Sequence, residues 1–157
     1  MAKKSSGKRG DSDKRAKTSS RRRIQYAALP YRSNGKSELE VMLVTSRGTQ
    51  RWIIPKGWPK IGLPPHRTAE EEAYEEAGVA GKVGKKRIGS YSYDKVLKAG
   101  LTASCRVQVF PLRVTRQHKQ WPEQHQRETR WYRPRDAARF VKEPSLRRLI
   151  RKFAKQR

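Results

Sequence analysis

The sequence predicts one mixed α/β (α+β) domain that follows a disordered basic tail. The 157 residues amount to about one domain. Apolar residues are nearly absent from the start of the chain and cluster from Ile24 onward, where segments rich in β-formers are followed by segments with helical features. We therefore expect a tail at residues 1–22, too polar to bury the surface that folding requires, and a folded domain at residues 23–157.

Strands are expected where β-branched, aromatic and aliphatic residues lie between turns. Residues 33–36 and 47–50 carry the Gly, Asn and Ser typical of such turns. Longer loops are expected at residues 57–65, which contain Gly and Pro, and at residues 117–127, which are polar. The predicted strands are residues 24–31, 39–45, 51–54, 83–96, 102–115 and 128–132.

Helices are expected in three places. Residues 134–141 suit one or two turns, and residues 144–155 have apolar side chains at helical spacing with Arg and Lys on the other face. The third is an acidic segment that ends at Gly78, in the position of a helix C-cap. It begins either at Pro65, which suits the first helical position, or at Thr68, which with Glu71 forms a capping box; we favour the longer helix.

The composition limits the classes of protein. A net charge of +25 favours an anionic partner: nucleic acid, a phosphate-rich small molecule or an anionic membrane surface. Residues 1–23 hold ten Lys or Arg and two Asp, a balance of +8, so +17 falls on the rest of the chain. The tail is expected either to contact nucleic acid non-specifically or to be merely solvated.

Cysteine and apolar content exclude other classes. The single cysteine, Cys105, excludes an internal disulfide framework and a cysteine zinc site, and we expect it to be a small buried residue. No stretch approaches the roughly 20 apolar residues of a membrane span, and the N-terminus lacks the apolar segment of a secretory signal. A cytoplasmic location is the simplest interpretation, and the oligomeric state is left open.

The acidic helix has the features of a metal site. Glu72, Glu75 and Glu76 stand at i, i+3 and i+4, so they project from one helical face. Like charges at this spacing destabilise an isolated helix, and the chain has only 14 acidic residues against 39 basic ones. A hard divalent cation such as Mg²⁺ explains the grouping. Complementing the helix dipole, or forming ion pairs, is the favoured explanation at this point, because helical spacing alone does not identify an enzyme.

The residues around these glutamates decide between the two explanations. From Gly57 to Val79 the chain follows the Nudix box, G-x5-E-x7-R-E-U-x-E-E-x-G-U, where U is a bulky aliphatic residue. Its second Glu, its Glu pair and its last Gly fall at Glu72, Glu75, Glu76 and Gly78. The segments 52–59 and 72–78 resemble the diphosphoinositol polyphosphate phosphohydrolase branch of the Nudix superfamily, including its bacterial members. The resemblance extends over about residues 24–155.

Two positions depart from the box. Leu63 stands where the first Glu is expected, and Glu71 stands where the box has Arg. In the family that Arg helps to orient a metal-binding carboxylate, so its absence bears on metal geometry and rate. Glu71 is expected either to cap the helix with Thr68 or to add a carboxylate to the site.

The resemblance implies an α/β/α sandwich with a mixed sheet and Mg²⁺-dependent hydrolysis of a diphosphate linkage, with Mn²⁺ as a substitute. It makes Glu72, Glu75 and Glu76 the metal ligands and catalytic residues, Gly57 and Gly78 structural, and the carbonyl of Lys56 a further ligand. Candidate phosphate-binding residues flank the box: Arg51, Lys56, Lys60, His66 and Arg67. Trp52 and Trp58 are candidates to stack on a base, although Trp52, in a strand, better suits the core. His118 and His125 are expected in solvent.

Several substrates suit this chemistry. The basic surface favours a dinucleoside polyphosphate or a diphosphoinositol polyphosphate, and an RNA 5′-end pyrophosphohydrolase is the alternative enzyme. A catalytically weak Nudix-like protein that binds RNA or another polyanion is the alternative outside enzymes, because Leu63 and Glu71 depart from the box.

Overall fold

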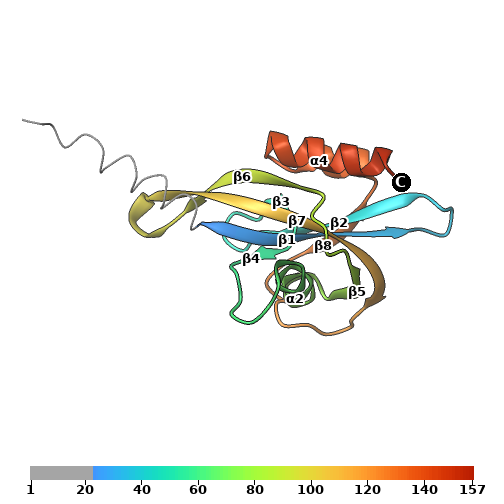
Figure 1. Cartoon of the computed structure of the whole chain (residues 1–157), viewed down its shortest axis with the longest axis horizontal. Coiled ribbons are helices and arrows are strands. Elements are labelled where there is room, and N and C mark those ends of the chain that lie inside the picture. The colour runs from blue at the N-terminus through green and yellow to red at the C-terminus, as the bar shows by residue number, and fades with distance from the viewer. Residues whose placement is uncertain (1–22) are drawn as a thin grey trace, which may run out of the picture.

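The computed structural model describes residues 23–157, so the predicted tail at residues 1–22 lies outside the described residues. Eight strands form one mixed sheet. Helix α2 (Pro65–Ala77) covers one face, and α3 (Pro134–Phe140) and α4 (Pro144–Lys155) lie on the other side (Figure 1). The predicted α/β/α sandwich with a mixed sheet is therefore confirmed.

The strands follow the order β3-β2-β1-β7-β5, with β4 paired to β1, β6 to β7 and β8 to β2. A short 3-10 turn, Lys98–Gly100, lies between β6 and β7. The bounds are β1 Ile24–Ser33, β2 Leu39–Thr45, β3 Trp52–Ile53, β4 Lys56–Gly57, β5 Val79–Val83, β6 Gly89–Val96, β7 Thr102–Gln117 and β8 Thr129–Tyr132.

Strand β1 lies at the centre of the sheet. It pairs in parallel with β7 from Ile24 to Tyr31 and antiparallel with β2 and β4 on its other edge. A strand with partners on both edges and helices over both faces has to be apolar in both directions. Accordingly Ala27, Ala28 and Leu29 are all fully buried. This burial explains why β1 is a continuous apolar run rather than an alternating one.

The sheet separates two hydrophobic clusters. The larger, between the sheet and α3 and α4, includes Leu29, Val107, Val109 and the apolar face of α4. The smaller lies under α2, where Ala69, Ala73 and Ala77 pack against Met42, Phe110 and Leu112. Because α2 presents only alanines to this cluster, its backbone lies close to the sheet. The short side chains bring the glutamates of the same helix close to the strands.

Two strand predictions are wrong in detail. The strand expected at residues 83–96 begins only at Gly89, as β6, and Val83 is instead the last residue of an unpredicted strand, β5, which pairs with a different part of β7. At the break, the Gly84 N–H donates to the Pro111 carbonyl (2.8 Å). The loop expected at residues 57–65 begins inside a short strand, β4, whose Gly57 pairs with Tyr26.

Helix α2 begins at Pro65, as the longer prediction requires. The capping box is wrong: Pro64 occupies the N-cap position, no side chain caps the helix, and the hydroxyl of Thr68 is buried without a partner among residues 23–157. The helix ends as predicted at Gly78, whose φ of 69° lies in the left-handed region. A Cβ at Gly78 would collide with the ring of Trp121.

Within residues 23–157, no helix has the length and apolar character needed to cross a membrane.

Because the ring of Trp121 occupies the space where a Cβ would lie, Gly78 is expected to contribute more to stability than another glycine with a positive φ. Gly78→Ala forces an alanine into the left-handed region and displaces Trp121, so we expect a loss of about 2–4 kcal/mol in the free energy of unfolding. Gly62→Ala is the matched control, because Gly62 has a φ of 83° and no atom near its would-be Cβ; it should cost about 1 kcal/mol. Urea denaturation measures both, and equal losses would contradict the packing argument.

Candidate functional site

The glutamates of α2 line a cleft of about 560 Å³. Its walls come from the start of β1, the β2–β3 turn, β4 and the loop after it, α2, β6 and the segment before β8. Basic and aromatic side chains face the glutamates across it. The lining includes Arg47, Lys56, Trp58, Lys60, Glu72, Glu75, Glu76, Tyr93, Lys95, Glu123 and Arg127. The structure therefore brings together the three predicted glutamates and two of the five predicted phosphate-binding residues, Lys56 and Lys60.

Gly57 leaves the space that Glu72 occupies. A Cβ at Gly57 would overlap the carboxyl group of Glu72, so only glycine allows the helix and β4 to approach this closely. The Glu72 carboxyl group lies against the β4 backbone and is largely buried, and this burial raises its pKa despite the contact with Lys60. The first glycine of the box thus has a steric role that the sequence pattern alone did not specify.

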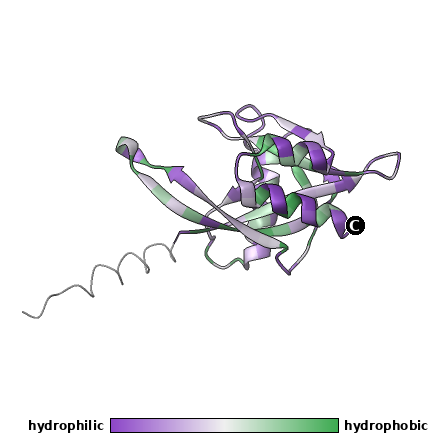
Figure 2. Cartoon of the chain, turned by 90° about the horizontal axis from the view of Figure 1, so that it is seen from above, coloured by the Kyte–Doolittle hydropathy of each residue, from purple (hydrophilic) through white to green (hydrophobic). Residues whose placement is uncertain are grey.

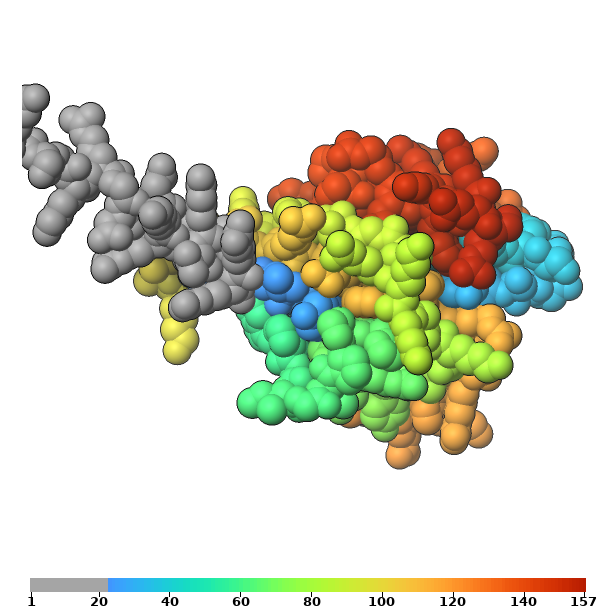
Figure 3. All heavy atoms as spheres, in the orientation of Figure 1, coloured from blue at the N-terminus to red at the C-terminus, as the bar shows by residue number. Residues whose placement is uncertain are grey.

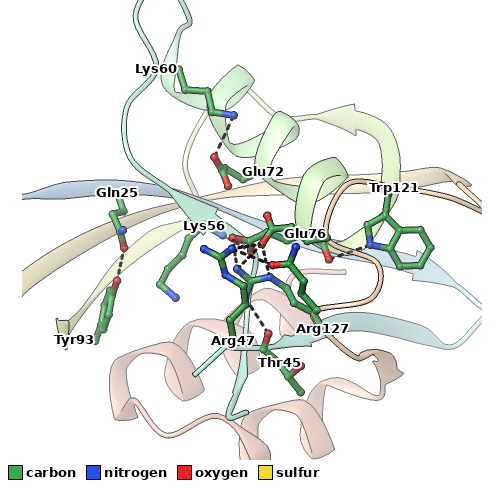
Figure 4. Close-up of polar contacts among 12 residues, drawn as sticks. Gln25, Thr45, Arg47, Lys56, Lys60, Glu72, Glu76, Tyr93, Trp121 and Arg127 are labelled. Carbon is green, nitrogen blue, oxygen red and sulfur yellow. Dashed lines mark hydrogen bonds and ion pairs between the residues drawn. The ribbon is translucent and has the colours of Figure 1, made fainter. Parts of the chain in front are cut away.

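Lys60 bridges the outer carboxylates. Its Nζ lies 3.2 Å from an oxygen of Glu72 (Figure 4). The same atom lies 3.1 Å from an oxygen of Glu75 and 3.6 Å from one of Glu71. Burial opposes the charge on Lys60, but the bonds to Glu75 and Glu72 outweigh it and raise the pKa of the lysine. Lys60 is thus a cation held at the point where two of the three glutamates converge.

Glu76 is the most buried member of the set, with 5% of its surface exposed. The backbone N–H of Lys56 donates to its Oε2 (3.3 Å), and Arg127 donates to its Oε1 (3.4 Å). Burial raises the pKa of Glu76 to about 7, against the opposing effects of Arg127 and Lys56. A carboxyl group with this pKa changes charge near neutral pH, a property typical of functional sites.

Lys56 lies beside Glu76 with its ammonium group 4.8 Å from the centre of the Tyr93 ring. Burial lowers the pKa of Lys56 to about 8, although Glu76 and Glu143 favour its charge. The Tyr93 hydroxyl donates to Gln25 (2.5 Å), which holds the ring at the edge of the cleft.

The loop of residues 118–128 brings in two further residues, Glu123 and Arg127. The loop is attached to the C-terminal end of α2: the N–H of His118 donates to the Gly78 carbonyl (2.8 Å), that of Glu123 to the Glu75 carbonyl (3.0 Å), and the Trp121 indole to the Glu76 carbonyl (3.3 Å). These bonds satisfy carbonyls that a helix end leaves without partners.

Arg127 connects this loop to the acidic helix. Its guanidinium group contacts Glu123 (3.0 Å) and Glu76 (3.4 Å), donates to the Thr45 carbonyl (3.0 Å), and is only 8% exposed. Sequence reasoning missed Glu123 and Arg127, because the segment looked like an ordinary polar loop. Its one aromatic residue, Trp121, was the available signal that the loop is anchored.

The donor set suits a hard cation, because it consists of carboxylates beside a backbone that glycine keeps open. Within residues 23–157 no three acidic, His or Cys side chains are close enough together to hold a metal ion as they stand. The reason is visible in the contacts: Lys60 holds Glu72 and Glu75, while Arg127 holds Glu76. Lys60 lies between the carboxylates of Glu72 and Glu75, so a metal held by these two glutamates would take its place.

The other candidate residues lie away from this arrangement. Arg51 lies 3.7 Å from Glu143, Arg67 pairs with Glu70, and neither these two nor His66 lines the cleft. Trp58 is 43% exposed at the cleft, whereas Trp52 packs edge-on against Tyr132.

Three smaller expectations concern residues near α2 and the sheet. Glu71 and Leu63 are exposed, and Glu71 contacts Lys60 without capping the helix. His118 was expected in solvent, but it is half-buried and packs edge-on against Tyr74, so that expectation is wrong. His125 is exposed and Cys105 is fully buried, as expected.

The fold is a mixed-sheet α/β/α sandwich with a glutamate-bearing helix over one face, which is the architecture that the Nudix box predicts. No family model matches the chain, but individual relatives do. Nudix hydrolase 18, mitochondrial, of Arabidopsis thaliana is 31% identical over 127 residues, which is 75% of this chain and 70% of that protein. Diphosphoinositol polyphosphate phosphohydrolase 3-alpha of Mus musculus is 35% identical over 118 residues, 73% of this chain and 66% of that protein. The chain belongs to the Nudix hydrolase family.

Solved structures share the fold. An Ap4A hydrolase of C. elegans superposes with a TM-score of 0.60 at 19% identity, covering 83% of this chain and 95% of that one. The E. coli dihydroneopterin triphosphate pyrophosphohydrolase gives 0.63 at 16% identity, covering 87% and 97%. The chain spans 59% of Nudix hydrolase 12 and 62% of Nudix hydrolase 17 of Arabidopsis thaliana, less than two thirds of either.

The pKa of Glu76 predicts a pH dependence of stability. Because its pKa rises from 4.5 to about 7 on folding, the folded state binds the proton more tightly. The stabilisation is fully present below about pH 4.5 and is lost as the pH rises through about 7. The shift corresponds to about 3 kcal/mol.

Glu76→Gln, neutral at every pH, should lack this dependence. Urea denaturation in EDTA at pH 5 and pH 8 measures it, and the parent should lose about 2–3 kcal/mol more than the variant between the two values. Equal losses would show that Glu76 does not titrate in this range.

Proposed function

We propose that this chain hydrolyses a diphosphate linkage in a phosphate-rich substrate, with Mg²⁺ or Mn²⁺ as cofactor. One observation supports the proposal above others: Glu72, Glu75 and Glu76 of the Nudix box line the same cleft as the basic residues Arg47, Lys56 and Lys60. Carboxylates and bases in one cavity suit a site where a metal and phosphate oxygens meet.

The glutamates of the site are proposed to bind the metal, and its glycines are proposed to shape the site. Glu72, Glu75 and Glu76 would hold the metal, with the Lys56 carbonyl as a further ligand. A bound divalent ion would neutralise phosphate charge and lower the pKa of an attacking water. One of the three glutamates would also accept a proton from this water. Gly57 keeps the space for Glu72 open, and Gly78 ends the helix so that the loop carrying Glu123 can attach.

The cleft favours a substrate with several phosphates. Lys60 is already bound to carboxylates and, when a metal displaces it, would become free to contact phosphate. Lys56 and Arg47 add positive charge from the opposite wall, and Lys95 lies 5.0 Å above the exposed ring of Trp58. This arrangement suits a dinucleoside polyphosphate or a diphosphoinositol polyphosphate. Two similar proteins are named for substrates of these kinds, an Ap4A hydrolase and a diphosphoinositol polyphosphate phosphohydrolase, which supports the proposal.

Substitution of the glutamates tests the reaction. Glu75→Gln and Glu76→Gln should each lower kcat at least about 100-fold with Mg²⁺, because each removes a charged ligand or base. Glu70→Gln is the matched control, since Glu70 lies on the same helix, pairs with Arg67 and is not part of the cleft lining. EDTA should abolish turnover in the parent.

The assay should cover dinucleoside polyphosphates, inositol pyrophosphates, ADP-ribose and 5′-triphosphorylated RNA, with products identified. Cleavage of the RNA alone would select a 5′-end pyrophosphohydrolase. Binding without turnover of any compound, or turnover that the glutamine variants retain, would contradict the proposed hydrolysis.

Arg127 is proposed as a positioning residue for Glu76. It contacts Glu123, the Thr45 carbonyl and Glu76 through three different nitrogens of one planar group, Nε, Nη1 and Nη2, and the compact ammonium of a lysine does not reproduce this spacing. Arg127→Lys should therefore lower kcat about 10-fold or more and change KM less than about 3-fold. Arg127→Gln should also move the acidic limb of the pH–rate profile to higher pH, because the guanidinium group lowers the pKa of Glu76.

The control is Arg133→Gln, which breaks an ion pair with Glu38 outside the cleft. A drop in activity for Arg127→Gln without movement of the pH profile would show a purely structural role.

A further inference from the structure

The outer face of α4 is a continuous basic stripe. Arg148, Arg151, Lys152 and Lys155 stand at i, i+3, i+4 and i+7, so they share one side of the helix, and all four are exposed. The opposite side carries Leu146, Leu149, Ile150 and Phe153, which are buried in the larger core cluster. Figure 3 shows α4, in red, as an exposed ridge on one side of the molecule. In Figure 2, hydrophilic and hydrophobic positions alternate along this helix.

The positive charges on this face are uncompensated. Among residues 23–157, no acidic side chain lies within ion-pair distance of any of the four. Four like charges at these spacings destabilise a helix by a few tenths of a kcal/mol per pair. By contrast, several acidic residues elsewhere in the chain are paired, including Glu40, Glu70 and Glu123. Lys152 and Lys155 lie in the last turn and complement the helix dipole, but no acidic side chain of the described fold matches the stripe.

The neighbouring segment extends the charge. Lys85, Lys86 and Arg87 are exposed and lead into Ile88, which packs against the same core cluster as α4. Next along the chain, Gly89 lies so close to Leu149 that a Cβ there would overlap it. The second basic group thus borders α4 rather than lying on a distant part of the surface.

The stripe does not serve the cleft. Helix α4 and the acidic helix α2 lie on opposite sides of the sheet (Figure 1), and none of the seven basic residues lines the cleft. A second anionic ligand, distinct from the substrate, explains their placement.

We propose that the α4 stripe, with residues 85–87, binds a nucleic-acid duplex through its phosphate backbone. A convex helix of 12 residues is about 18 Å long and presents cations in a row, as backbone contacts require. The exposed large apolar residues of the described chain lie outside α4, so the helix lacks the apolar face with which a peripheral helix enters a membrane. It also lacks an exposed aromatic platform for stacking single-stranded bases.

The test compares two full-length variants with equal loss of charge. One carries Arg148→Gln, Arg151→Gln, Lys152→Gln and Lys155→Gln. The control carries Lys36→Gln, Lys98→Gln, Arg116→Gln and Lys119→Gln, four exposed residues on other elements that are likewise without ion pairs among residues 23–157. Binding to a fluorescent duplex of about 20 base pairs, as RNA and as DNA, is measured against salt concentration.

The α4 variant should weaken binding about 10-fold or more and reduce the slope of log K against log salt by roughly 0.9 for each phosphate that is no longer neutralised. The control should weaken it less than about 3-fold, and Arg148→Lys with Arg151→Lys should retain binding. Hydrolysis of a small substrate should be unchanged in the α4 variant. Thermal unfolding shows that each variant is folded.

Three results would overturn the proposal. Equal weakening in the α4 variant and the control would mean a diffuse electrostatic effect. Tighter, α4-dependent binding to phosphatidylserine-containing vesicles than to duplex would identify a membrane surface. Equal α4-dependent binding to single-stranded oligo(U) would remove the duplex from the assignment. Comparison of the RNA duplex with the DNA duplex shows which of the two nucleic acids the stripe binds more tightly.

Discussion

The burial of Glu76 is the constraint on which the rest of the site depends. A carboxyl group with 5% exposure needs hydrogen bonds and opposite charge from its surroundings. The Lys56 N–H comes from β4, and the Arg127 guanidinium comes from the loop before β8. Three segments therefore meet at one carboxyl group, and Arg127 connects them to a fourth, the end of β2, by donating to the Thr45 carbonyl. The raised pKa of Glu76 records that these partners compensate its burial only in part.

Close approach of α2 to the sheet makes this arrangement possible. Alanines at 69, 73 and 77 fill the space beneath the helix, and Gly57 leaves room for Glu72. The C-terminal end of the helix then accepts bonds from the loop that carries Glu123 and Arg127. The arrangement of the three carboxylates and the packing of α2 thus depend on the same contacts, which is why both glycines of the box lie next to this end of the helix or its acids in space. The opposite side of the sheet, covered by α4, is independent of this packing.

Local patterns made much of the fold predictable. The strand at Leu39–Thr45 and the helix from Pro144 to Lys155 have the predicted bounds. The strand contains an unbroken apolar run that is buried on both faces, and the apolar spacing of the helix matches its one buried face. The separation of β5 (Val79–Val83) from β6 (Gly89–Val96) was missed, although residues 84–87, Gly-Lys-Lys-Arg, are poor β-formers. Their separation follows from pairing with different parts of β7. The capping box failed because two consecutive prolines started the helix one turn earlier.

By itself, the sequence determined the acidic face of α2, its C-terminal glycine and the basic character of the domain, since these depend on residue spacing and composition. Only the tertiary structure decided which cations meet those acids. Lys60 was a candidate from sequence and does contact them, whereas Arg51, His66 and Arg67 were equally basic neighbours and do not line the cleft. Arg127 comes from a loop 51 positions away from Glu76. A charge–charge contact depends on distance in space, which the chain sets only after the loop has bonded to the helix end.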